Sequence, residues 1–221
     1  MFKKFPGSLF FDTLCSHCHA REVDQNGFLC SVCLNSLYPK PLRYFEFEFL
    51  DGIFSFAPYE GVGKTYLHLI KFQGAKNLIP FLGKLVKPTL RKVIEEIKPD
   101  LVSFVPTHPF RVWFTRGFDQ VEELIKGTYP NYVQLFERGL IPKKPLYLVG
   151  SKFNRKKHLK GSYKLKPEMA KLVEGKKVLL IDDLITTGST GNTLAYLLKS
   201  VGADSVYLFT VFYKIKAANV G

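Results

Sequence analysis

The sequence lacks any run of about 18 consecutive apolar residues, the length that a membrane-spanning helix needs. It also lacks low-complexity tracts, and 46% of its 221 residues are apolar, which excludes a disordered chain. Near the start, Pro6, Gly7 and Asp12 interrupt the apolar core that a signal peptide requires. We therefore expect a cytoplasmic protein, with peripheral attachment to the inner membrane left open.

Acidic residues are scarce relative to basic ones, 19 against 32, which gives a formal net charge of +13. A surplus of this size favours polyanionic partners such as nucleic acid, phosphorylated metabolites or an acidic membrane surface. A compositionally biased genome would also enrich lysine, but it would scatter the residues along the chain. Residues 138–167 instead contain ten Lys or Arg and no acidic residue. This basic segment therefore points to a polyanion.

Cysteine is confined to the amino-terminal part, where two C-x2-C pairs are separated by eleven residues: Cys15, Cys18, Cys30 and Cys33. Each pair can turn two sulfur atoms toward one point, and two pairs complete a tetrahedral thiolate site. Structural zinc is the prediction, because four thiolates leave no open position for catalysis. Two disulfides or an iron centre would use the same residues, but disulfides do not suit a chain without an export signal.

The first 41 residues are expected to form a separate module and linker, followed by the main domain over residues 42–221. Such a short segment can bury little core, so bound metal should fold it. Pro39 and Pro41 favour an extended linker. Spacing does not distinguish a module that binds nucleic acid from one that docks on its own chain, and docking is slightly favoured.

The main domain alternates strand-like and helix-like patterns, which predicts an α/β fold with a mostly parallel sheet flanked by helices. The expected strands cover 44–50, 53–56, 100–105, 132–136, 178–181 and 205–213, with a hairpin turn at 51–52. The expected helices cover 63–72, 77–97, 119–126 and 189–200, and Lys64 and Lys71 of the first are expected to point outward. Ligands of such folds bind beyond the carboxyl ends of the strands.

The most specific motif is VLLIDDLITTGST, residues 178–190. A buried strand here brings two carboxylates to its carboxyl end, and a glycine-containing turn leads into a helix. Free N–H groups, the positive end of the helix dipole and the hydroxyl side chains would form a phosphate cradle. Carboxylates suit vicinal ribose hydroxyls, so a pentose phosphate fits better than a nucleoside triphosphate. The alternative is an ordinary strand–turn–helix in which Thr190 caps the helix.

This motif resembles the phosphoribosyl pyrophosphate (PRPP) motif of type I phosphoribosyltransferases. Other segments resemble the ComF family (ComFC- or GntX-like competence proteins): the four cysteines, residues 59–61 and 69–72, 105–106, 116–120 and 161–163. The resemblance covers nearly the whole chain. It implies a zinc-binding segment on a type I phosphoribosyltransferase-like domain, and a role in natural transformation in handling incoming single-stranded DNA.

The resemblance also implies roles for individual residues. Asp182 and Asp183 would hold the ribose hydroxyls, and the 5′-phosphate would be held by Thr186, Thr187, Gly188, Ser189 and Thr190. Pyrophosphate would be received by a loop that includes Thr107, His108 and Arg111. A mobile basic loop would close over the diphosphate and contact DNA through Lys152, Arg155, Lys156, Lys157 and Lys160. Mg²⁺ would arrive with PRPP, held by its oxygens and by water.

Two departures from the family pattern bear on the activity. Asp119 stands where the family usually has Asn, and prolines stiffen the approach to the basic loop. The sequence offers no obvious nucleophile or base for an acceptor. We therefore expect a protein that binds PRPP and single-stranded DNA. The alternative hypothesis is an active phosphoribosyltransferase. A third hypothesis is a zinc-stabilised adaptor that docks on a DNA translocase or helicase.

Overall fold

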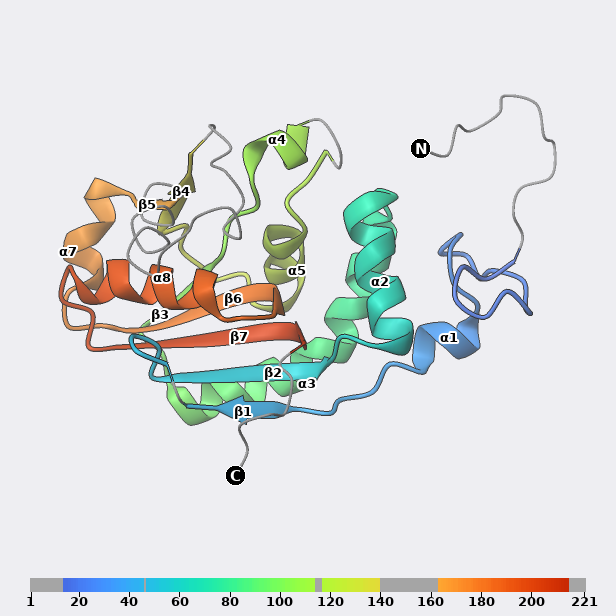
Figure 1. Ribbon diagram of the computed structural model, residues 1–221, viewed down its shortest axis with the longest axis horizontal. Helices are drawn as coiled ribbons and strands as arrows, with labels where there is room; N and C mark the ends of the chain where they lie inside the picture. The colour runs from blue at the N-terminus through green and yellow to red at the C-terminus, as the bar shows by residue number, and fades with distance from the viewer. Residues whose placement is uncertain (1–13, 46, 114–116, 140–162, 215–221) are drawn as a thin grey trace, which may run out of the picture.

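The computed structural model describes residues 14–45, 47–113, 117–139 and 163–214, whose main feature is a five-stranded sheet (Figure 1). The strand order is β1 (Leu42–Tyr44), β2 (Gly52–Pro58), β7 (Ser205–Tyr213), β6 (Lys177–Ile185) and β3 (Leu101–Phe104). Strand β1 runs antiparallel to β2, and the other pairings are parallel. The predicted α/β class with a mostly parallel sheet is therefore confirmed.

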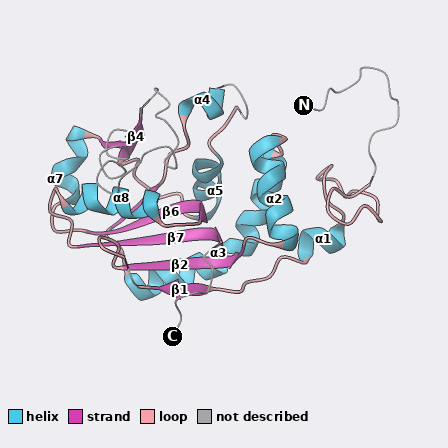
Figure 2. Cartoon of the chain, viewed as in Figure 1, coloured by secondary structure: helices cyan, strands magenta, loops and turns pink. Residues whose placement is uncertain are grey.

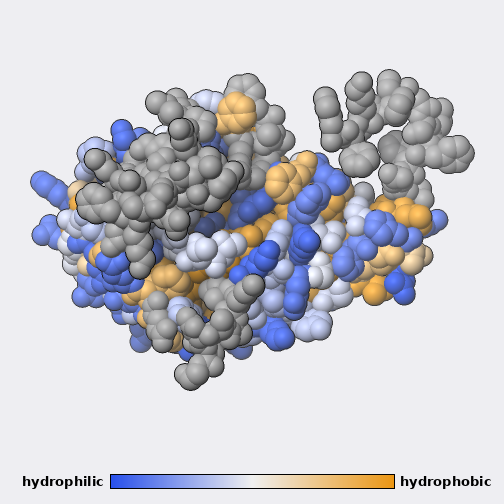
Figure 3. Space-filling model, in the orientation of Figure 1, coloured by the Kyte–Doolittle hydropathy of each residue, from blue (hydrophilic) through white to orange (hydrophobic). Residues whose placement is uncertain are grey.

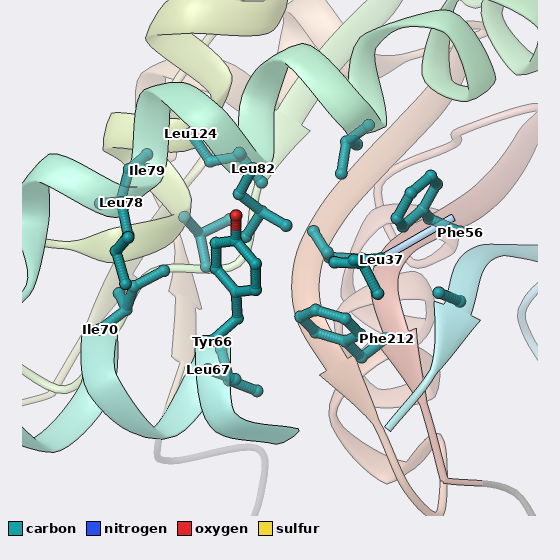
Figure 4. Packing of buried hydrophobic residues seen from close by; sticks show 14 of the residues in the cluster. Leu37, Phe56, Tyr66, Leu67, Ile70, Leu78, Ile79, Leu82, Leu124 and Phe212 are labelled. Carbon is teal, nitrogen blue, oxygen red and sulfur yellow. The ribbon is translucent and has the colours of Figure 1, made fainter. Parts of the chain in front are cut away.

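One face of the sheet is covered by α3 (Ile79–Ile97) and α5 (Gln120–Thr128), and the short helix η1 (Lys76–Leu78) leads into α3. Helix α2 (Gly61–Phe72) belongs to the same apolar cluster and lies at the carboxyl end of the sheet (Figure 1). Helix α3 buries Leu82, Val86, Leu90, Val93 and Ile97, whose spacing of three or four residues makes one apolar stripe. Figure 4 shows Tyr66 of α2 inside this cluster, with Leu78 and Ile79 on one side and Phe212 of β7 on the other.

The opposite face is covered by α8 (Ser189–Lys199), α7 (Ala170–Val173) and a small antiparallel pair, β4 (Phe136–Arg138) with β5 (Tyr163–Leu165). The helix η4 (Pro167–Met169) joins β5 to α7. Figure 2 shows the sheet between the two helical layers. Because both faces are covered, β6 is apolar on both: Leu179 and Ile181 face one cluster, Val178 and Leu180 the other.

The amino-terminal module lies at one end of the molecule, where α1 (Ser31–Asn35) packs near α2 (Figure 1). Leu29, Leu34 and Leu37 are buried in the same cluster as Tyr66 and Leu67. The linker continues along the sheet, since the Lys40 N–H donates to the carbonyl of Phe56 at 2.9 Å. Docking on the main domain, the slightly favoured expectation, is what the described residues show.

The strand expected over 44–50 is wrong beyond Tyr44. Phe45 is exposed, and residues 47–51 pack along α8 instead of extending the sheet. The Phe49 N–H donates to Oδ1 of Asn192 at 2.9 Å, and the ring of Phe49 meets Tyr196 edge-on. The alternating phenylalanines thus reflect burial of Phe47 and Phe49 against a helix rather than pairing with a strand.

The expected hairpin is present as the antiparallel pair β1–β2, but β1 ends at Tyr44 and β2 begins at Gly52, so the connection is longer than a tight turn at 51–52. The carboxylate of Asp51 accepts a hydrogen bond from the Val206 N–H at 2.6 Å and pairs with Lys199. The strand expected over 132–136 is displaced to β4. Residues before it instead follow the edge of β3, where the Val133 N–H donates to the Val102 carbonyl at 2.8 Å. Within the described residues, no helix combines the length and apolarity that crossing a bilayer requires.

Candidate functional site

The four cysteines converge in the amino-terminal module. Their Sγ atoms all lie within 4.8 Å of one another, and those of Cys18 and Cys30 are 3.9 Å apart. Tetrahedral zinc with Zn–S bonds of about 2.3 Å places its sulfur ligands slightly under 4 Å apart. None of the four is in a disulfide, so the disulfide alternative is wrong. The donor set and its spacing therefore fit a structural zinc ion.

The electrostatics of the cluster also suit a cation. Burial opposes ionisation of Cys15, but hydrogen bonds from the backbone of Cys18, Cys30 and His17 outweigh it and lower the pKa of this thiol to about 6. Burial and the other three thiols raise the pKa of Cys33 to about 12. Neighbouring thiolates repel one another, which opposes ionisation of all four cysteines. A divalent cation would offset this repulsion, because it binds cysteine as the thiolate.

The module is fixed to α2 and η1 by polar contacts. The Tyr66 hydroxyl donates to the Leu34 carbonyl at 3.2 Å, and the Asn77 side-chain amide donates to the Asn26 carbonyl at 2.6 Å. Nδ1 of His17 lies 2.9 Å from Oγ1 of Thr65. The four-cysteine module therefore packs against α2, and Lys71 is near the far end of that helix.

The turn between β6 and α8 has the geometry expected of a phosphate cradle. Gly188 caps the helix with φ of +69°, in the left-handed region that favours glycine. The first hydrogen bond within the helix runs from the Asn192 N–H to the Gly188 carbonyl. The N–H groups of Ser189, Thr190 and Gly191 precede it and have no intrahelical partner. The Ser189 N–H donates to the Thr187 hydroxyl at 3.5 Å, a long hydrogen bond that an anion at the positive end of the helix dipole could replace.

Asp182 and this turn line one small pocket of about 40 Å³, together with Leu184, Ile185, Gly191 and Leu208. The pocket holds a group the size of a few water molecules, so it suits a phosphate better than a whole sugar diphosphate. Burial and the neighbouring Asp183 carboxylate raise the pKa of Asp182 to about 8. The Thr187 and Ser189 hydroxyls are 2.9 Å apart at its rim.

Asp183 points to the other face of β6, as alternation along a strand requires. One of its oxygens accepts from Nζ of Lys71 at 2.6 Å, and the other accepts from the Gln120 side-chain amide. The expectation that Lys71 points outward is wrong, because its side chain is only 18% exposed. The two acids are adjacent in the sequence, but in the structure their side chains contact different residues.

The loop expected to receive pyrophosphate follows β3 and runs into α4 (Pro109–Arg111). The Thr107 N–H donates to the Asp119 carboxylate at 2.6 Å, and its hydroxyl donates to Gln120 at 3.2 Å. Nδ1 of His108 accepts from the Phe110 N–H at 3.2 Å. Arg111 lies in α4, but its side chain is outside the described part of the structure, as are all atoms of Lys152, Arg155, Lys156, Lys157 and Lys160.

Three contacts at this site were not predicted from the sequence. Gln120 and Lys71 hold Asp183, although they lie 63 and 112 positions away from it. Phe47 packs against Gly188 of the turn. No local sequence pattern predicts these contacts. Alternating phenylalanines and a lysine on a helix are equally compatible with an exposed surface.

Comparison with known proteins identifies the domain and the family. The family described as phosphoribosyl transferase domain matches residues 138–219. Competence protein ComFC of Streptococcus pneumoniae (strain ATCC BAA-255 / R6) is 30% identical over 158 residues, which are 69% of this chain and 64% of that protein. The chain thus matches less than two thirds of the length of the pneumococcal relative.

Competence protein F of Haemophilus influenzae (strain ATCC 51907 / DSM 11121 / KW20 / Rd) is 24% identical over 90% of this chain and 96% of its own length. A solved structure described as the allosteric regulatory enzyme of purine biosynthesis covers 62% of this chain and 26% of its own, with a TM-score of 0.39 and 19% identity. That similarity is too low to support an inference. On the curated relatives and the matching domain, the chain is a member of the ComF family with a phosphoribosyltransferase-like domain.

Proposed function

We propose that this protein binds PRPP with Mg²⁺ beyond the carboxyl end of β6 and handles single-stranded DNA during natural transformation. The observation that carries the ligand assignment is the pocket in which Asp182 adjoins the glycine-capped turn at the start of α8. The competence association is supported by the names of the two curated relatives.

In this proposal, different residues of the site bind different parts of PRPP. The 5′-phosphate accepts hydrogen bonds from the N–H groups of Ser189, Thr190 and Gly191 and from the hydroxyls beside them. Asp182 accepts a hydrogen bond from a ribose hydroxyl. The diphosphate extends toward the loop at Thr107, and Mg²⁺ supplies charge neutralisation there when bound.

Calorimetric titration of PRPP with Mg²⁺ tests this assignment. At pH 9, above the pKa of about 8 that burial and Asp183 give Asp182, Asp182→Asn should weaken binding about tenfold or more, since hydrogen bonds to charged groups contribute about 1.5–3 kcal/mol. The matched control is Asp204→Asn, the same chemical change at an exposed position before β7. Absence of PRPP binding to the wild-type protein would contradict the proposal.

DNA binding is assigned to the basic segment on the strength of its sequence. Its cations would neutralise phosphates, and Phe153, Tyr147 and Tyr163 offer aromatic rings for unpaired bases. Tyr163 is described, and it is buried with the guanidinium of Arg138 4.7 Å from its ring centroid. A buried ring cannot stack on a base, so the proposal assigns stacking to Tyr147 and Phe153 and not to Tyr163.

One observation favours the second candidate, an active phosphoribosyltransferase. A cavity of about 550 Å³ opens beside Thr107, lined by Phe104, Trp113, Glu137 and Arg138 among others. Its volume is in the range of small-molecule sites, so an acceptor could occupy it next to the diphosphate. Release of pyrophosphate from PRPP on addition of an acceptor would favour this activity, whereas the binding role predicts slow hydrolysis alone.

The zinc ion is proposed to be held by Cys15, Cys18, Cys30 and Cys33 and to serve the fold. Figure 3 shows apolar residues gathered over this module, where Leu14 and Val32 are exposed. This surface is compatible with docking on a translocase or helicase, the third hypothesis. Retained DNA uptake by a protein carrying both Asp182→Asn and Asp183→Asn would favour that adaptor role.

A further inference from the structure

The two adjacent acids of the PRPP motif have different surroundings. The small pocket at the turn includes Asp182 but not Asp183. Asp183 is 7% exposed and borders instead a very small void among Leu67, Ile70, Leu82 and other residues of the α2–α3–α5 cluster. A sugar hydroxyl in the pocket would therefore meet Asp182 first.

The carboxylate of Asp183 already has two strong donors. Nζ of Lys71 lies 2.6 Å from Oδ1, and the Gln120 side-chain amide donates to Oδ2. The side chains of Lys71 and Asp183 are 18% and 11% exposed, so this ion pair is largely shielded from water. Breaking such a pair on one side is more costly than replacing both partners by apolar or neutral groups.

The hydrogen bonds continue from Asp183 to the loop after β3. Oε1 of Gln120 accepts from the Thr107 hydroxyl at 3.2 Å, so one buried amide joins the acid to that loop. The Thr107 N–H donates to Asp119, which also caps the start of α5 through the N–H groups of Val121 and Glu122. Helix α2, strand β6, helix α5 and the loop are thus joined by side-chain contacts.

We propose that Asp183 is an anchor for the loop at Thr107, with Lys71 and Gln120 as positioning residues, and that Asp182 alone of the two acids contacts the ribose. This assignment rests on the proposed binding of PRPP. It divides the site into a ribose 5-phosphate half set by Asp182 and the turn, and a pyrophosphate half whose position depends on Gln120.

A charge-balanced double substitution separates an anchor from a ligand contact. Asp183→Asn alone deprives Lys71 of its carboxylate, and Lys71→Met removes that charge. If Asp183 is an anchor, K71M/D183N should bind ribose 5-phosphate at pH 9 within about threefold of wild type, while D182N loses about tenfold or more at the same pH. A folded K71M/D183N protein that loses ribose 5-phosphate binding as D182N does would overturn the assignment.

A second variant tests the positioning role of Gln120 with two probes. Gln120→Leu should weaken binding of magnesium pyrophosphate by about fivefold to tenfold, the value of a typical hydrogen bond, and leave ribose 5-phosphate within about twofold. Equal losses for both probes would show a general structural defect and overturn the positioning role. If wild-type protein bound neither probe nor PRPP, the proposed function itself would fail. If it bound them and the variants behaved otherwise than expected, only the anchor assignment would fail.

Discussion

The ring of Phe47 lies against Gly188, and a β-carbon added to this glycine would overlap that ring. Gly188 also has φ of +69°, so two independent features require glycine at the start of the turn. We predict that Gly188→Ala lowers the free energy of unfolding by about 1–3 kcal/mol and weakens ribose 5-phosphate binding. Urea unfolding and calorimetry measure the two effects.

Gly127 provides the control for that substitution. It lies inside α5 with nothing within 4 Å of an added β-carbon. Gly127→Ala should therefore leave ligand binding unchanged and stabilise the protein by up to about 1 kcal/mol, as in other helix interiors. Equal behaviour of the two alanine variants would contradict the role given to the turn.

Asp182 should make stability depend on pH. Burial and Asp183 raise its pKa to about 8 from an ordinary value of 3.8, so the folded protein holds a proton that the unfolded chain has lost between these values. The free energy of unfolding should fall as pH rises from about 4 to about 8, by at most about 1.4 kcal/mol per unit from this group. Asp182→Asn should flatten the slope in urea titrations. An unchanged slope would contradict the shifted pKa.

Metal removal should destabilise the end of the molecule that contains α2. The four sulfur atoms lie within 4.8 Å of one another, and Tyr66 joins α2 to the Leu34 carbonyl. We predict bound zinc by mass spectrometry, and a loss of at least about 2 kcal/mol of stability on chelation or in Cys30→Ser. His17→Ala should keep the zinc, because the His17 ring contacts Thr65, while its contact with Cys15 is made by the backbone and is kept in alanine. Unchanged stability without metal would refute a structural zinc.

The basic segment should dominate DNA affinity. Reversing Arg155, Lys156 and Lys157 to Glu should weaken single-strand binding and lower the slope of log affinity against log salt by about 2, at about 0.7 per phosphate contact. The control reverses Lys84, Lys87 and Lys92, three exposed lysines of α3, and changes the net charge equally. Gel-shift titrations at several salt concentrations compare the two. Equal losses would show that net charge alone attracts DNA.

Much of the fold could be predicted from local patterns. Helix α3 and strands β6 and β7 follow their hydrophobic periodicity, because each buries one stripe or both faces in the core. The segment at 44–50 could not be predicted, since alternating phenylalanines bury equally well against a neighbouring strand or along a helix. In this protein the segment packs along α8, where Phe49 contacts Asn192 and Tyr196, and both of these residues are distant in sequence.

In the candidate site, too, local motifs could be predicted from the sequence and contacts between distant residues could not. The cysteine spacing and the residues of the turn are local motifs, and the structure brings each set together. The pairing of Lys71 with Asp183 spans 112 positions, and it is set by how α2 packs on the sheet. Alternation along β6 turns the two acids to opposite faces, and tertiary packing determines which residues each of them contacts.

A crystal structure of the zinc-loaded protein with PRPP and Mg²⁺ tests the central claim most directly. We predict the 5′-phosphate on the N–H groups of Ser189, Thr190 and Gly191, with a ribose hydroxyl on Asp182 and Asp183 still paired with Lys71. PRPP bound elsewhere, or a turn without phosphate at saturating ligand, would contradict the account.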